Sequence, residues 1–127
     1  MNLIDSSGWI EYVTDEENAD FFDPPINDPE NLLVPTICLY EVFKRVLREY
    51  GEERALDAAG LLSLGQIVDL DRQTAIIAAR ISTELKLAMA DSIILATAHA
   101  YDATLWTQDE HFKDMDGVKY IEKKTTP

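Results

Sequence analysis

The chain has 127 residues, 46% of them apolar, and its 24 acidic against 11 basic residues give a formal net charge of −13. This length fits one domain with one hydrophobic core, so we treat residues 1–127 as a single domain. The charge argues against binding of nucleic acid through a broad basic surface, and no window approaches the roughly 18 apolar residues of a membrane-spanning helix.

Short strands and longer helices are predicted to alternate along the chain. In order, they are a strand at 2–4, a helix capped by Ser6 or Ser7 and running through Val13, a strand at 32–34, a helix from Pro35-Thr36 to about Tyr50, a helix at 52–62, a weak strand at 67–68, a helix at 71–85, a helix at 88–101, a strand at 104–107, a short helix capped by Asp109 and a strand at 118–121. Such alternation predicts an α/β fold whose short, mostly parallel sheet is covered by helices on both faces.

Three segments have distinctive patterns. The helix at 35–50 places its large apolar side chains on one stripe, and the helix at 88–101 is apolar on most faces, which indicates burial. The segment 15–30 contains seven acids, three prolines and no base, and we interpret it as a solvated loop. The stripe of the helix at 35–50 consists of Tyr40, Phe43, Leu47 and Tyr50.

The predicted compartment is the cytoplasm. The first residues, Met1 to Asp5, have no basic region of the kind that begins a signal peptide. The one cysteine, Cys38, cannot form an intramolecular disulfide, and we expect it to be a small buried apolar residue.

Four carboxylates are expected at one edge of the sheet, because ligands of open α/β sheets bind beyond the carboxyl ends of the strands. Asp5 follows the first strand, Asp109 follows the strand at 104–107, Glu41 lies in the second turn of its helix, and Asp91 begins the apolar helix. Clustered carboxylates repel one another unless a cation is present. Oxygen ligands without a cysteine or histidine partner suit Mg²⁺ or Mn²⁺, and such ions support phosphodiester hydrolysis.

Each of these acids also has an ordinary structural explanation. Asp5, Asp91 and Asp109 can cap helices or turns. Glu41 can pair with Lys44 or Arg45 on the same helix.

Each of the four acids lies in one of four segments, which are Ile4 to Tyr12, Pro35 to Val42, Ala90 to Ala98 and Leu105 to Phe112. Together these segments resemble the PIN-domain family, and within it the VapC toxins of toxin–antitoxin pairs. Each segment alone is a weak signal, but their order and spacing over essentially the whole chain are characteristic. The resemblance implies that Asp5, Glu41, Asp91 and Asp109 bind one or two Mg²⁺ or Mn²⁺ ions and activate the attacking water.

The same resemblance gives further expectations. Ser6 and Thr107 match hydroxyl positions that support the site. The family's fold is a parallel sheet between helices, its members usually form homodimers and cut RNA, and a VapB-type antitoxin silences them by inserting a basic residue. The acidic segment 15–30 departs from the family pattern, and it would repel RNA if it overhung the site.

Other side chains leave two explanations open. Trp9 and Trp106 can stack on bases, although aromatic residues beside short strands are more often part of the core. His111 can lie at the rim of the site, whereas His99 falls in the apolar helix without a companion. The bases of the Glu41 helix, Lys44, Arg45 and Arg48, can contact phosphate or form a solvated face.

Two other functions compete with a nuclease. A PIN-like module that binds a partner or nucleic acid without cutting it would retain the fold. A signalling receiver domain has similar length and acidity, but Asp5 is followed by Ser6 rather than a second acid, and Asp57 lies in a predicted helix.

Overall fold

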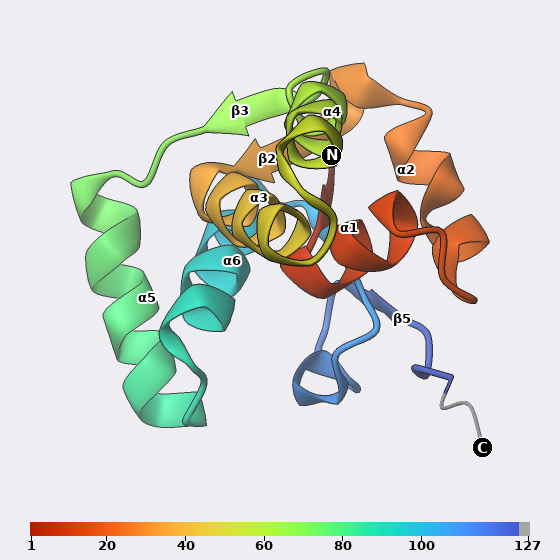
Figure 1. The fold of residues 1–127 in the computed structure, drawn as a ribbon. Helices are drawn as coiled ribbons and strands as arrows, with labels where there is room; N and C mark the ends of the chain where they lie inside the picture. The colour runs from red at the N-terminus through yellow and green to blue at the C-terminus, as the bar shows by residue number, and fades with distance from the viewer. Residues whose placement is uncertain (125–127) are drawn as a thin grey trace.

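The computed structural model describes residues 1–124, in which five strands form one parallel sheet flanked by helices on both faces (Figure 1). The predicted α/β fold is therefore confirmed. In chain order the elements are β1 (Asn2–Ile4), α1 (Ser6–Val13), η1 (Ala19–Phe22), α2 (Asp23–Ile26), η2 (Pro29–Asn31), β2 (Leu32–Pro35), α3 (Thr36–Tyr50), α4 (Glu52–Leu62), β3 (Gln66–Val68), α5 (Arg72–Leu85), α6 (Met89–Ala100), β4 (Thr104–Thr107), η3 (Glu110–Phe112) and β5 (Val118–Tyr120).

The strand order β3-β2-β1-β4-β5 places a topological switch point between β1 and β4. The chain extends the sheet in one direction from β1 to β3 and then crosses to the other side for β4 and β5. Ile4 pairs with Trp106, so Asp5, which follows β1, lies beside Thr107, the last residue of β4. In an open parallel sheet this is the position where ligands bind.

The core lies where the strands meet the helices. Leu3, Ile4 and Val34 on the strands are fully buried, as is Ile94 on α6. The prediction that α6 is buried is confirmed over Ser92–Ala98. Trp9 and Trp106 are 1% and 8% exposed, which favours a core role over stacking on bases. Within residues 1–124, no helix has the length and apolar character needed to cross a membrane.

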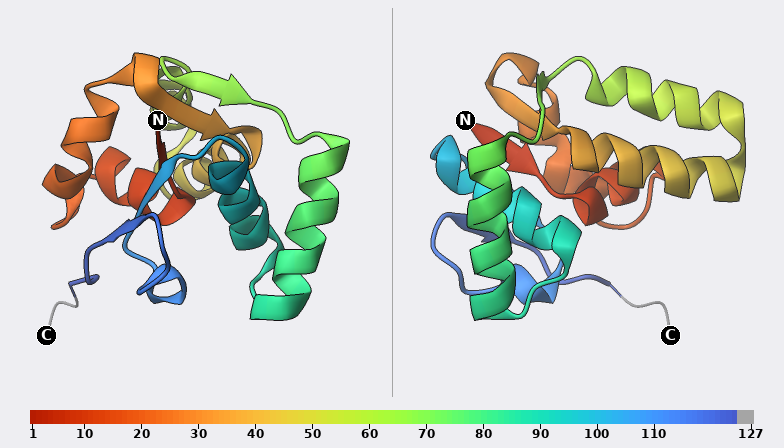
Figure 2. Two further views of the ribbon diagram at one scale, coloured as in Figure 1. Left: turned by 180° about the vertical axis from the view of Figure 1, so that it is seen from behind. Right: turned by 90° about the vertical axis from the view of Figure 1, so that its left-hand side faces the viewer.

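The apolar stripe predicted for α3 is mostly exposed, and of its four residues only Phe43 is partly buried against the core. The buried residues of α3 are Cys38, Val42 and Val46, whereas Tyr40 is 60% exposed. Both sets follow helical spacing, and the smaller side chains face the sheet. Figure 2 shows α3 and α4 as a long helical hairpin that projects from the sheet. The other exposed members of the predicted stripe are Leu47 and Tyr50.

The acidic segment 15–30 is folded, which corrects its interpretation as a solvated loop. It forms η1, α2 and the start of η2. Phe22 is fully buried and its ring packs edge-on against that of Phe21, with centroids 5.0 Å apart. Apolar anchors therefore fix this segment against α1 while most of its acids remain in solvent.

Gly8 is required by close packing between α1 and the acidic segment. A Cβ atom at this position would lie 2.5 Å from Phe22 Cε1 and 2.7 Å from Ile4 Cγ2. We expect Gly8→Ala to destabilise the fold by about 1–3 kcal/mol, the usual cost of overpacking a core. Chemical denaturation measures this change. Gly60→Ala is the control, because a Cβ on Gly60 in α4 meets nothing within 4 Å; equal effects of the two substitutions would contradict the packing argument.

Candidate functional site

The four predicted carboxylates line one cleft of about 520 Å³ at the carboxyl edge of the sheet. Asp5 follows β1, Glu41 lies on α3, Asp91 lies in the first turn of α6 and Asp109 follows β4. The structure thus brings these side chains together from four separate elements. Their roles as metal ligands and catalytic groups stay predictions.

Asp5 is held more firmly than any other acid of the cleft. It caps α1 by accepting a hydrogen bond from the Gly8 amide at 2.9 Å, so the predicted cap by Ser6 or Ser7 is wrong. Its Oδ2 also accepts a hydrogen bond from Thr107 Oγ1 at 2.6 Å, and Ser7 Oγ donates to the same carboxylate at 2.8 Å. Asp5 is only 2% exposed, so these donors define one orientation of its carboxylate.

The two predicted supporting hydroxyls both contact carboxylates. Ser6 Oγ donates to Glu41 Oε1 at 2.6 Å, and Thr107 Oγ1 donates to Asp5 while accepting the backbone amide of Asp109 at 2.9 Å. Thr107 therefore links two of the four acids. The alternative pairing of Glu41 with Arg45 is not observed, because Arg45 pairs with Glu49 at 2.5 Å.

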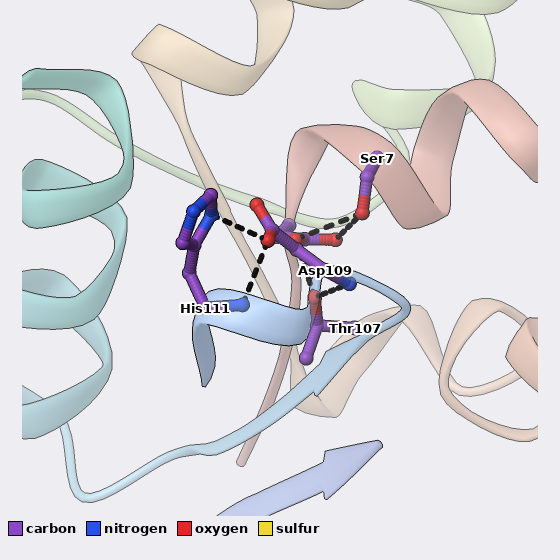
Figure 3. Close-up of polar contacts among 5 residues, drawn as sticks. Ser7, Thr107, Asp109 and His111 are labelled. Carbon is purple, nitrogen blue, oxygen red and sulfur yellow. Dashed lines mark hydrogen bonds and ion pairs between the residues drawn. The ribbon is translucent and has the colours of Figure 1, made fainter. Parts of the chain in front are cut away.

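Asp109 combines a structural and an electrostatic role (Figure 3). It caps η3, as predicted, since its Oδ1 accepts the His111 amide at 2.9 Å. The same oxygen lies 2.8 Å from His111 Nδ1. Among residues 1–124, His111 is the only basic side chain that pairs with any of the four acids.

The cleft perturbs two carboxyl groups. Burial raises the pKa of Asp5 to about 7, against the opposing hydrogen bonds of Thr107, Gly8 and Ser7 and with a contribution from the Asp109 charge. Burial likewise raises the pKa of Asp91 to about 6, and repulsion from Asp109 and Glu41 adds to the effect. The folded, metal-free protein therefore disfavours the charged forms of Asp5 and Asp91, mainly because these groups are buried.

These residues fit a divalent cation. The donor set consists of carboxylate oxygens from separate elements, and the perturbed pKa values show that negative charge is disfavoured there without compensation. Hard oxygen donors of this kind suit Mg²⁺ or Mn²⁺.

A family-level match accounts for the whole arrangement. Residues 3–118 match the sequence model of the PIN domain. The chain belongs to the PIN-domain family. The four carboxylates of this PIN domain come from the same segments on which the resemblance was based, and the predicted family is confirmed.

Three solved structures resemble this PIN domain over nearly its whole length. A toxin–antitoxin complex from Klebsiella pneumoniae is 25% identical with a TM-score of 0.77, covering 94% of this chain and 96% of that chain. DNA-bound VapBC from Salmonella typhimurium is 20% identical with a TM-score of 0.73, covering 96% and 98%. VapC20 from Mycobacterium tuberculosis, a sarcin–ricin loop cleaving toxin, is 15% identical with a TM-score of 0.73, covering 88% and 92%. The last two show a shared fold alone, and no curated protein sequence matches the chain.

A buried polar network beside the acids was not predicted from the sequence. Glu11 is 8% exposed, and its carboxylate accepts hydrogen bonds from the Asn18 amide at 2.8 Å and from Gln108 Nε2 at 3.1 Å. Gln108 Oε1 in turn accepts from Asn18 Nδ2 at 3.0 Å. The network ties α1 and the acidic segment to the turn that carries Asp109. The one signal in the sequence is spacing: Glu11 lies four residues after Ser7, so both side chains are on the same side of α1, the side that faces the cleft.

The rim of the cleft carries charges of both signs. Glu16 and Glu17 of the acidic segment line the cleft, so this segment does reach the site. It is therefore placed where its charge would repel RNA, as the sequence analysis considered. Three bases also line it, namely Arg45, Lys123 and Lys124. His99 is exposed at the end of α6 and lines a separate cleft.

Proposed function

We propose that this PIN domain is a Mg²⁺- or Mn²⁺-dependent endoribonuclease that acts as the toxin of a VapBC-type toxin–antitoxin pair. The observation that carries the proposal is the convergence of Asp5, Glu41, Asp91 and Asp109 in one cleft without a lysine or arginine paired to any of them among residues 1–124. The similar fold of a toxin that cleaves the sarcin–ricin loop supports RNA as the substrate.

The residues of the cleft have distinct tasks in this proposal. Asp5, Glu41, Asp91 and Asp109 would hold one or two divalent ions. When bound, such an ion orients and acidifies the attacking water and neutralises charge on the phosphoryl group. The hydrogen bonds from Ser7, Gly8 and Thr107 fix Asp5 in advance, and Ser6 fixes Glu41. Ligands that are already oriented lose little freedom when the ion and the substrate bind.

The strong negative charge limits how RNA is held. With a net charge of −13, binding through a broad surface is disfavoured, so phosphate contacts would be local. Arg45, Lys123 and Lys124 are the bases that line the cleft within residues 1–124 and would supply them. The same acids would attract a basic side chain of an antitoxin, and the similar fold of a toxin from a toxin–antitoxin complex supports a partner of this kind.

Homodimer formation also stays a prediction. Large apolar side chains of α5 and the start of α6 are exposed, and a second copy would cover them. A molar mass of one chain in light scattering would contradict the dimer. These side chains are Ile76, Ile77, Leu85 and Met89.

Cleavage of labelled total RNA by purified, antitoxin-free protein tests the proposed function. We expect discrete cuts with Mg²⁺ or Mn²⁺ and none with EDTA, because the acids alone supply no activated water. The fragments would identify the RNA. Folded protein that binds Mn²⁺ and makes no cuts would favour the alternative, a PIN-like module that binds RNA or a partner without cleaving it.

A further inference from the structure

His111 lies beside the acids, although the proposed function assigns it no task. It belongs to η3, whose neighbouring Phe112 is fully buried and anchors the turn. Its side chain is 66% exposed, yet Nδ1 lies 2.8 Å from Asp109 Oδ1. Figure 3 shows the imidazole facing Asp109 next to the strand end that carries Thr107.

Capping of η3 does not explain the position of this ring. The cap is the hydrogen bond from the His111 backbone amide to Asp109, which any residue at this position would provide. The imidazole makes a separate contact with the same oxygen. The cap therefore does not require a histidine at position 111, and the imidazole can have a separate role.

The imidazole of His111 and the carboxylates of Asp91 and Asp109 lie close enough together to bind one ion. One ligand atom each from Asp91, Asp109 and His111 lie within 4.8 Å of one another. Ligands about 2.1 Å from an octahedral ion are about 3.0 Å apart at neighbouring corners and about 4.2 Å apart at opposite ones. The 2.8 Å separation of Nδ1 from Asp109 Oδ1 is close to the neighbouring-corner distance.

We propose that His111 is a nitrogen ligand of the divalent ion, beside Asp91 and Asp109, and that it makes the site prefer Mn²⁺ to Mg²⁺. This inference rests on the metal site of the proposed function and adds to it. Mg²⁺ strongly favours oxygen ligands and retains its water, whereas first-row transition ions accept imidazole more readily. Mn²⁺ is the member of that series best suited to a set that is otherwise carboxylate.

Electron spin-echo spectroscopy of bound Mn²⁺ tests this assignment without measuring activity. A directly coordinated ¹⁴N nucleus modulates the echo. We expect the modulation in the wild-type chain and in His99→Gln, and its loss in His111→Gln. His99 is the matched control, because it is the other histidine of the chain and lines a separate cleft.

Competition between ions provides the second measurement. The concentration of Mg²⁺ that displaces half of the bound Mn²⁺ is expected to fall by about tenfold in His111→Gln, in the range typical of changes around a bound metal. His111 is exposed, so the variant is expected to fold, which circular dichroism checks. If His111→Gln fails to fold, the presence or absence of ¹⁴N modulation in the wild-type chain still decides whether a nitrogen atom binds the ion.

The outcomes separate this inference from the proposed function. Bound Mn²⁺ without ¹⁴N modulation in the wild-type chain would overturn the role of His111 and leave the carboxylate site intact. Modulation that persists in His111→Gln would do the same. A wild-type chain that binds no Mn²⁺ at all would overturn both proposals.

Discussion

Asp5→Asn is expected to lower metal-dependent RNA cleavage by more than about 100-fold, beyond the 10–100-fold cost typical of losing an outer partner of a metal ligand. Asparagine preserves the shape of the side chain and can still accept the Gly8 amide. It removes the negative charge and leaves a poorer ligand at the most buried acid of the cleft. Initial cleavage rates at saturating Mn²⁺, together with the Mn²⁺ affinity of each protein, measure the effect.

Thr107→Val is the matched comparison for this substitution. It removes the hydroxyl that donates to Asp5 at 2.6 Å and accepts the Asp109 amide at 2.9 Å, but it removes no ligand. We expect a smaller loss, of about 10–100-fold. A cleavage rate for Asp5→Asn close to that of the wild-type chain would contradict its role as a ligand. Equal losses for both variants would indicate that positioning accounts for the whole effect.

The convergence of the four acids was predictable because sheet topology constrains it. Parallel strands bring their carboxyl ends to one edge, so correct strand assignments were enough to place Asp5 and Asp109 at that edge. Their closeness also depends on the adjacency of β1 and β4, which the structure shows and the sequence analysis did not predict. Asp91 was recognisable as a lone carboxylate in an apolar helix, because such a group requires a compensating partner.

The contacts that orient these acids were less predictable. Gln108 and Glu11 are 97 residues apart in the chain, and Gln108 and Asn18 are 90 apart. Neither contact follows from local spacing. The cap of α1 was misassigned for a related reason: Asp5, Ser6 and Ser7 all have capping side chains, and only the position of β1 decides which one meets the Gly8 amide.

Periodicity also failed where a helix has two apolar stripes. Along α3 the spacing of Tyr40, Leu47 and Tyr50 is as helical as that of Cys38, Val42 and Val46. The pattern identifies residues that share a face, but the volume available next to the sheet decides which face is buried. The small residues occupy it, while Tyr50 lies at the far end of α3, where Arg54 of α4 lies 4.2 Å from the centre of its ring.

The site has a cost in stability that depends on pH. Within residues 1–124 neither Asp5 nor Asp91 is paired with a lysine or an arginine, and burial makes the charged forms of these two carboxyl groups unfavourable in the folded, metal-free chain. This is the arrangement expected of a site whose charge is balanced by a bound cation. The titration of Asp5 therefore makes that cost measurable.

The metal-free wild-type chain is expected to lose stability relative to Asp5→Asn as the pH rises from about 4 to about 7. The folded pKa of Asp5 is about 7 against an ordinary 3.8, so its favourable contribution is complete below 3.8 and is lost as the pH rises through 7. The shift corresponds to on the order of 4 kcal/mol. Urea denaturation in EDTA at fixed ionic strength measures the difference between the two free energies of unfolding. Asp57→Asn, an exposed change on α4, is the control substitution. A difference for Asp5→Asn that does not change with pH would contradict the raised pKa. Saturating Mn²⁺ should restore the stability of the wild-type chain above pH 7, because the ion binds the carboxylates of the folded state.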